Sequence, residues 1–304
     1  MRYMNRLEKL ETERSNAKTN NLDIMTVKEI ISAMNEEDQT VALAVQKVLP
    51  QIEEAIHIVH KGLSNNGRLL YIGAGTSGRI GLLDAVECPP TFSTSPKMVQ
   101  AVLAGGFGAV MVAVEGAEDD QELGKNDLKQ QHLTTNDVVV GIAASGRTPY
   151  VIGALAYAQS VGAKTISLSS NLQSAISLYA DVAIEVETGP EVLTGSTRLK
   201  AATAHKMVVN MISTASMIQI GKVYKNLMVD VHASNFKLKE RAKMIVCEAT
   251  NSTYEAAEQV LVETGFNVKQ AIVMILTGST AEEGKGLLEK ANGKVRVAIG
   301  REET

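Results

Sequence analysis

Apolar positions in the first part of the chain recur at helical spacing. Residues 1–22 are polar and predict an extended arm. Thr26 and Glu29 form a T-x-x-E capping box, which predicts the start of a short helix. Apolar residues three and four apart then run through positions 41–63, the pattern of an amphipathic helix. Pro50 should kink or split that helix, because proline lacks the backbone N–H that helix pairing needs.

Short apolar runs bounded by glycine predict the strands of a sheet. They lie at residues 68–73, 99–103, 137–144, 164–168 and 181–186. The run D-V-V-V-G-I-A-A at 137–144 is apolar throughout, as parallel strands buried on both faces are. Helical patterns separate the strands, and the longest spans about 200–220. The sequence therefore predicts a three-layer α/β fold: an open, mostly parallel sheet with helices on both faces.

The pattern changes after Gly221. Four short helices are predicted, at residues 240–250, 254–264, 268–277 and 281–290. We expect an N-terminal arm with helices at 1–54, the sheet domain at 55–225, and a small C-terminal helical subdomain at 226–304.

Composition narrows the possible functions. The net charge is −4, and we find no basic stripe or aromatic platform, so nucleic-acid binding is not expected. The two cysteines, Cys88 and Cys247, lack metal-ligand spacing and suit a reducing compartment. No signal peptide is recognisable, and no apolar run approaches the ~20 residues of a membrane helix. We expect a cytoplasmic protein.

Two loops have the chemistry of phosphate sites. G-A-G-T-S-G at 73–78 and A-A-S-G-R-T at 143–148 each follow a strand and open a helix. Backbone N–H groups and the helix dipole favour an anion there, and hydroxyls add donors. The first loop also reads G-x-G-x-x-G, but residues 89–95 lack the acid that a dinucleotide site needs. The alternative is that both loops are capping turns without a ligand.

Longer motifs resemble one family. G-A-G-T-S-G-R-I-G-L-L-D-A-V-E-C-P-P-T-F at 73–92 resembles N-acetylmuramic acid 6-phosphate etherases, as do the motifs at 114–119, 141–150, 194–206 and 226–231. The resemblance implies a sugar isomerase (SIS) domain, a homodimer, and a lyase that recycles cell-wall amino sugars. It places Glu87 and Glu118 at the catalytic positions. Ala143 stands where other branches of the superfamily carry serine, which leaves one fewer hydroxyl for the phosphate.

The implied reaction releases D-lactate from N-acetylmuramic acid 6-phosphate. It needs two proton-transfer groups but no metal and no cofactor. With the ring open, a base removes the hydrogen on carbon 2, an acid protonates the leaving lactyl oxygen, and water adds at carbon 3. We assign the acid to Glu87, at the end of a helix that Pro89-Pro90 should stop, and the base to Glu118, which follows a Gly-containing turn after a predicted helix. From residues alone, Glu87 also suits a solvated helix end, and only the resemblance selects Glu118 from its acidic run.

The substrate would contact Thr76, Ser77, Ser145, Gly146, Arg147, Thr148 and Glu191. For Glu191, helix capping is an equal alternative. His205 could face the site from the long helix, but a lone histidine on a helix is more often structural. For Arg147, the alternative is a solvent-exposed side chain. Two other functions stay open: an aminosugar-phosphate isomerase on the same fold, and a non-catalytic sugar-phosphate sensor. The isomerase would not need Glu87 as an acid, and the sensor would normally carry duplicated sugar-binding domains.

Overall fold

A computed structural model describes residues 10–112, 114–231 and 235–300. The predicted capping box is confirmed, because Thr26 and Glu29 exchange side-chain and backbone bonds at the start of α2 (Val27–Gln46). That helix is longer than expected, and Pro50 lies at the start of the next one, α3 (Leu49–Ser64). Proline is tolerated in a first helical turn, where its missing N–H has no partner to lose.

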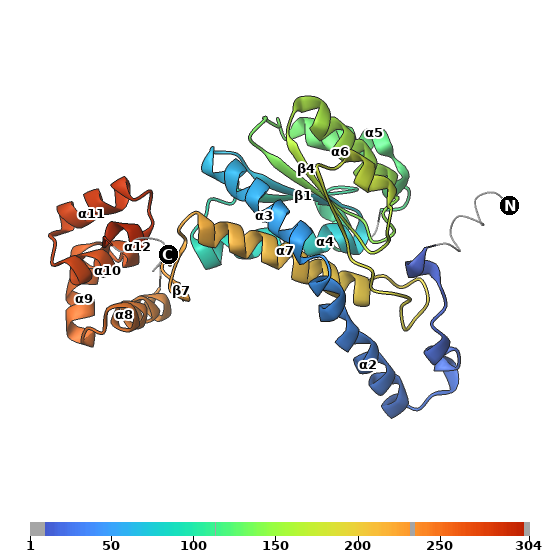
Figure 1. Cartoon of the computed structure of the whole chain (residues 1–304), viewed down its shortest axis with the longest axis horizontal. Helices are drawn as coiled ribbons and strands as arrows, with labels where there is room; N and C mark the ends of the chain where they lie inside the picture. Colours follow the sequence, from blue (N-terminus) through green and yellow to red (C-terminus); the bar gives the residue numbers. More distant parts are fainter. Residues whose placement is uncertain (1–9, 113, 232–234, 301–304) are drawn as a thin grey trace. The chain divides into compact units, whose positions relative to one another are not determined.

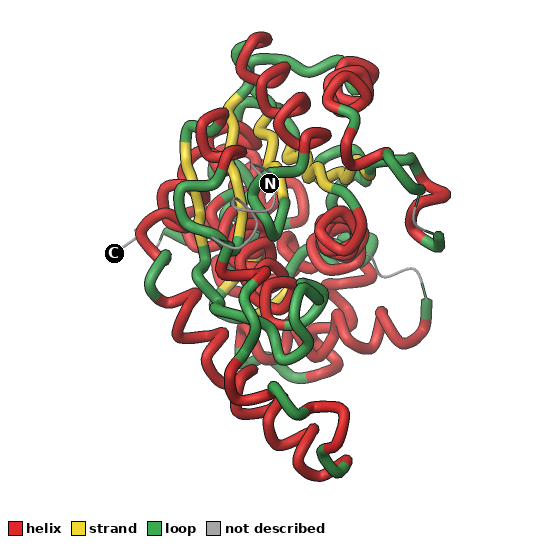
Figure 2. The backbone as a smooth tube through the Cα atoms, turned by 90° about the vertical axis from the view of Figure 1, so that its right-hand side faces the viewer, coloured by secondary structure: helices red, strands yellow, loops and turns green. Residues whose placement is uncertain are grey.

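Five parallel strands form one sheet in the order β2-β1-β3-β4-β5. Their bounds are β1 Leu69–Gly73, β2 Val99–Leu103, β3 Val138–Ile142, β4 Lys164–Ser169 and β5 Val182–Glu185. Each lies within one or two residues of a predicted strand. The residues of β1 and β3 are buried throughout, which explains their uninterrupted apolar sequences. The strands run side by side among the helices (Figure 2).

Helices cover both faces of the sheet, as predicted (Figure 1). Leu70 and Ile72 share a core with α5 (Gln121–Gln130) and α6 (Pro149–Val161). Tyr71, which points to the opposite face, bonds with its hydroxyl to Asp84 of α4 (Gly75–Phe92) and to the carbonyl of Val209 in α7 (Lys200–Gln219). This alternation is what period-two side-chain geometry requires of a strand buried between two helical layers.

The C-terminal region is helical, with α8 (Phe236–Thr250), α9 (Tyr254–Glu263), α10 (Val268–Thr277), α11 (Ala281–Lys290) and α12 (Val295–Ala298). These helices enclose their own apolar core. The sequence did not indicate α12, nor the two-residue strands β6 (Val223–Tyr224) and β7 (Leu227–Met228). No single helix of the described chain is long and apolar enough to cross a membrane. Only α9 and α10 together pass that test, and they are bent by 117°.

The described residues fall into two compact units. One comprises the chain up to Ala85 with Lys97–Ser213, and the other comprises Val86–Pro96 with the chain from Thr214 onward. The predicted domain boundaries at 54 and 225 stay a prediction.

Candidate functional site

The two hydroxyl-bearing loops leave the sheet next to each other. Residues 73–78 connect β1 to α4, and residues 143–148 connect β3 to α6. The strands β1 and β3 are parallel neighbours, with Gly73 in register with Ile142. Both loops therefore lie at the carboxyl edge of the sheet, where open α/β folds bind their ligands.

The second loop is built around a glycine turn. Gly146 has a φ of 68°, and a Cβ at this position would stand 2.2 Å from the Cβ of Ser174, so only glycine fits. Ser145 Oγ accepts a bond from Arg147 N at 3.3 Å. Thr148 is the N-cap residue of α6, and its side chain makes no capping bond within the described chain. The loop therefore carries two hydroxyls and a guanidinium beside the positive end of a helix.

The first loop is equally tight. Thr76 and Ser77 are half-buried in the first turn of α4. A Cβ on Gly78 would stand 2.5 Å from the carbonyl oxygen of Gly73, so the helix begins in direct contact with the end of the strand. The two predicted hydroxyls thus lie at a helix N-terminus, where backbone N–H groups also favour an anion.

A third segment, the support loop at residues 169–177, holds the second loop. Ser170 N donates to the carbonyl of Ala144, and Ile176 N donates to that of Gly146, both at 3.0 Å. The Glu185 carboxylate holds the support loop in turn. It accepts bonds from Gln173 N, Ser174 N and Ser177 Oγ. Hydrogen bonds therefore continue from the Glu185 side chain of β5 through the support loop to the predicted phosphate site.

His205 supports the same loop from α7. It is buried, and its Nε2 lies 3.1 Å from Ser170 Oγ. Burial lowers the pKa of the imidazole to about 4, against a raising effect of its hydrogen bond at Ser169. A neutral histidine that holds a loop matches the structural alternative, because its Nε2 is engaged with Ser170.

Glu118 is exposed in η5 (Ala117–Asp119), a 3-10 helix that packs against α6. Gly116, with a φ of 76°, makes the turn before it, and Ala117 is buried in the core. The expected helix upstream is the 3-10 helix η4 (Phe107–Val110). Arg79 of α4 donates to the carbonyls of Ala109 and Val110, so the first turns of α4 hold this segment.

Glu87 is exposed on α4. Our expectation that Pro89-Pro90 ends this helix is wrong, since α4 continues to Phe92 with both prolines in its last turns. Ser93 N still donates to the carbonyl of Pro89, so the turn closes although two N–H groups are missing. Glu87 and Glu118 fall in different compact units.

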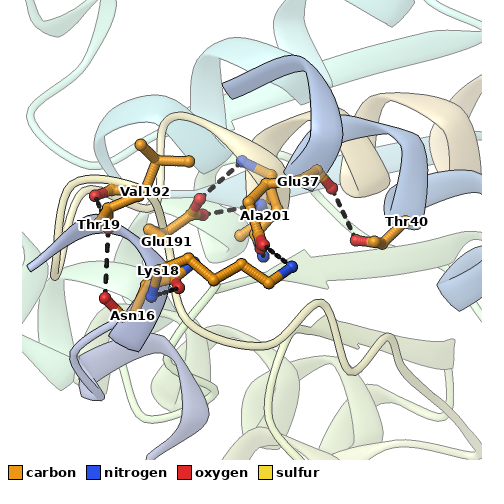
Figure 3. A network of polar contacts seen from close by, with 9 residues as sticks. Asn16, Lys18, Thr19, Glu37, Thr40, Glu191, Val192 and Ala201 are labelled. Carbon is orange, nitrogen blue, oxygen red and sulfur yellow. Dashed lines mark hydrogen bonds and ion pairs between the residues drawn. The ribbon is translucent and has the colours of Figure 1, made fainter. Parts of the chain in front are cut away.

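Glu191 is fully buried, and both of its carboxylate oxygens are engaged. They accept bonds from Lys200 N at 2.9 Å and Ala201 N at 3.0 Å, at the start of α7 (Figure 3). Burial raises the pKa of this carboxyl, although the two amide bonds oppose the rise. Helix capping, the alternative to substrate contact, therefore describes its contacts in the structure.

Two family models match the chain. The N-terminal SIS domain of glucokinase regulatory protein matches residues 40–159, and the SIS domain matches residues 121–215. Among curated proteins, N-acetylmuramic acid 6-phosphate etherase of Geobacillus sp. is 61% identical over 96% of this chain and 99% of its own length. The same enzyme of Bacillus cereus is 59% identical over 96% of this chain and all of its own length. The chain belongs to the N-acetylmuramic acid 6-phosphate etherase family.

Two solved structures have a fold similar to that of this chain. A phosphoheptose isomerase from Neisseria gonorrhoeae has a TM-score of 0.50 at 20% identity, over 62% of this chain and 98% of its own. One from Francisella tularensis has the same TM-score at 17% identity, over 64% of this chain and all of its own. These likenesses show the sugar isomerase fold alone.

Sequence reasoning missed two residues that brace the elements around the candidate site. Asp84 of α4 is 5% exposed and accepts bonds from Tyr71, Ser213 and Asn210. Asn171 is buried in the support loop. Nothing in the local sequence singles them out, because each acts on a partner more than ten residues away. Among the described residues, no group of three metal-ligating side chains gathers.

Proposed function

We propose that this protein is an N-acetylmuramic acid 6-phosphate etherase, which cleaves the D-lactyl ether to give N-acetylglucosamine 6-phosphate and D-lactate. The observation that carries the proposal is the 61% identity to an etherase over 96% of the chain. The adjacent loops at 73–78 and 143–148 support it, because they offer hydroxyls and helix N-termini to the 6-phosphate.

The proposed chemistry is an elimination followed by an addition. With the sugar ring open, the aldehyde at carbon 1 acidifies the hydrogen on carbon 2. Glu118 removes that hydrogen, and Glu87 protonates the departing lactyl oxygen. Glu87 then activates the water that adds to carbon 3. Both carboxylates are exposed in the single chain, where substrate and solvent can reach them. Each positioned proton transfer contributes roughly 10²–10⁴-fold to the rate.

The 6-phosphate would lie across Thr76, Ser77 and the loop Ser145–Thr148. Arg147 supplies the positive charge, as a partner for the phosphate or for the lactyl carboxylate. Ser145→Ala should raise KM, since a hydrogen bond to a charged group is worth about 1.5–3 kcal/mol. An unchanged KM in that variant would remove Ser145 from the phosphate site.

We further propose that the enzyme acts as a homodimer in the cytoplasm. Large apolar side chains stay exposed on the single chain, among them Val27 and Ile31 of α2 and Phe107 and Met111 at η4. Exposed apolar surface of this kind favours association with a second copy. The apolar stripe of α7 suits a dimer contact less well, because Val208 and Ile212 are buried within the chain. Light scattering at assay concentration tests the assembly, and an active monomer would contradict it.

The deciding experiment is an assay of D-lactate released from N-acetylmuramic acid 6-phosphate by the purified protein. An isomerase would change the sugar without releasing lactate, and a sensor would bind without turnover. Isotope exchange in heavy water then separates the roles. Glu87→Ala should exchange the hydrogen on carbon 2 while releasing almost no lactate, whereas Glu118→Ala should lose both activities. If only Glu118→Ala still exchanges the hydrogen on carbon 2, then Glu87 is the base and Glu118 is the acid.

A further inference from the structure

Asn171 joins two distant parts of the chain. Its side chain is 2% exposed, and its Nδ2 donates to the carbonyl oxygen of Ala144 and to Thr12 Oγ1, both at 3.0 Å. Only the amide NH₂ can donate to a carbonyl, so the bond to Ala144 determines which way the amide is turned. Ala144 lies inside the loop at 143–148, and Thr12 comes from the N-terminal segment.

The contact with Ala144 determines the direction of the next N–H group. The carbonyl of Ala144 and the N–H of Ser145 belong to one planar trans peptide, in which they point in opposite directions. Ser170 N and Asn171 Nδ2 both donate to this oxygen. The Ser145 N–H is therefore directed away from the support loop, and it finds no acceptor within the described chain.

The N-terminal segment 10–19 is itself firmly attached. Thr12 is fully buried. Thr19 Oγ1 donates to the carbonyl of Val192 at 2.8 Å, and Lys18 Nζ lies 2.9 Å from Glu37 Oε1. Glu37, which Figure 3 labels beside Lys18, also pairs with Lys200 at 2.6 Å. Besides the bond to Asn171, two attachments therefore hold the segment that carries Thr12, one from Thr19 and one from Lys18.

A buried asparagine is an unfavourable residue at position 171 if its only role is to stabilise the fold. Its Oδ1 is buried and has no partner among the described residues. Most buried polar atoms are paired, because an unpaired one gives up its bonds to water without replacement. A leucine of similar size would avoid that cost. What an asparagine supplies and a leucine lacks is the pair of bonds to Ala144 and Thr12.

We propose that Asn171 and Thr12 are positioning residues that aim the Ser145 amide at the sugar 6-phosphate, so that the N-terminal segment is a working part of the site. The inference rests on the proposed function in one respect, namely that the loop at 143–148 holds the phosphate. It assigns neither residue a contact with the substrate.

Three variants test the proposal. Asn171→Leu removes both bonds, and Thr12→Val removes the acceptor from Nδ2 with little change in shape. Thr19→Val is the matched control, because it removes the buried threonine bonds to Asn16 and Val192 from the same segment, leaves Asn171 untouched, and keeps the Lys18–Glu37 pair that holds the segment in place. Titration calorimetry with N-acetylglucosamine 6-phosphate gives Kd, and the lactate assay gives KM and kcat separately.

We expect Asn171→Leu to weaken binding of N-acetylglucosamine 6-phosphate about tenfold and to raise KM in parallel, the effect of a misdirected bond to a charged group. Thr12→Val should weaken binding less than Asn171→Leu does. A double variant that combines Thr12→Val with Asn171→Leu should bind no worse than Asn171→Leu alone, because both changes act through one contact. Thr19→Val should bind like the wild type. Equal losses in Thr12→Val and Thr19→Val, or unchanged binding in Asn171→Leu, would overturn the proposal.

The outcomes separate this inference from the proposed function. If the wild type releases D-lactate and Asn171→Leu binds the sugar phosphate normally, the positioning role fails and the function stands. If the wild type binds the sugar phosphate but releases no lactate, the function fails, and the three binding constants still decide the positioning role. If it binds no sugar phosphate at all, both proposals fall.

Discussion

Asp84 is a buried carboxyl for which the structure predicts a measurable dependence of stability on pH. It lies on α4 three residues before Glu87 and is 5% exposed. Its oxygens accept bonds from Tyr71 OH at 2.8 Å, Ser213 Oγ at 2.9 Å and Asn210 Nδ2 at 3.2 Å. These bonds join α4 to β1 and to α7.

Burial raises the pKa of Asp84 from 3.8 to about 6, although the bonds from Tyr71 and Ser213 oppose the rise. Between these two pH values the folded protein keeps a proton that the unfolded chain has lost. The contribution of Asp84 to stability is therefore fully present below pH 3.8 and is lost as the pH rises through 6. At about 1.4 kcal/mol per pKa unit, the loss amounts to roughly 3 kcal/mol.

Asp84→Asn removes the titration and keeps one oxygen to accept a bond. Urea unfolding followed by circular dichroism, from pH 4.5 to pH 7.5, gives the free energy of unfolding of both proteins. The wild type should lose stability relative to Asp84→Asn as the pH rises, by about 2 kcal/mol of the total because the window opens at pH 4.5, and the difference should level off above about pH 7. Parallel curves for the two proteins would show that burial does not shift this carboxyl, and the reasoning would be refuted.

Three further changes test other parts of the structure. Relative to His205→Asn, the wild type should lose stability as the pH falls from 6.5 towards 4, because the buried imidazole resists the proton that the unfolded chain takes up; urea unfolding of both proteins at pH 5 and pH 7.5 measures the difference. Glu191→Gln replaces one of the oxygens that cap α7 and should lower the free energy of unfolding by about 1.5–3 kcal/mol in the same assay, whereas an unchanged value would mean that the cap is unimportant. Gly153→Ala should cost about 1–3 kcal/mol, seen as a lower Tm, because its Cβ would lie 1.9 Å from the carbonyl oxygen of Gln121; a wild-type Tm would show that α5 and α6 separate easily.

The strands were predictable because the cause of each lies within its own residues. A run such as V-V-V-G-I is apolar throughout since helices cover both faces of β3, and glycines mark where the chain leaves the sheet. The capping box at Thr26 is local in the same way. Motif spacing likewise located both loops at one sheet edge, because the carboxyl ends of parallel strands lie together.

The residues that hold the loops were not predictable, because their partners come from elsewhere in the chain. Asn171 bonds to Thr12, 159 positions away, and Glu37 to Lys200, 163 positions away. Pro89-Pro90 misled for a related reason: proline removes N–H groups from a helix, but whether the helix ends depends on the bonds that remain. Helix propensity gives the free energy by which a residue such as proline destabilises a helix. Only the folded structure shows whether other contacts offset that destabilisation.

Asp84 and His205 titrate in opposite senses over nearly the same range of pH. Asp84 loses its contribution as the pH rises from 3.8 to about 6, and His205 loses its own as the pH falls from 6.5 to about 4. Both effects are worth roughly 3 kcal/mol, so they largely cancel in the wild type. A flat pH profile of the intact protein would therefore say nothing against either group. Removing one of them should uncover the slope of the other, which is why single variants are needed to read the two buried groups on α4 and α7.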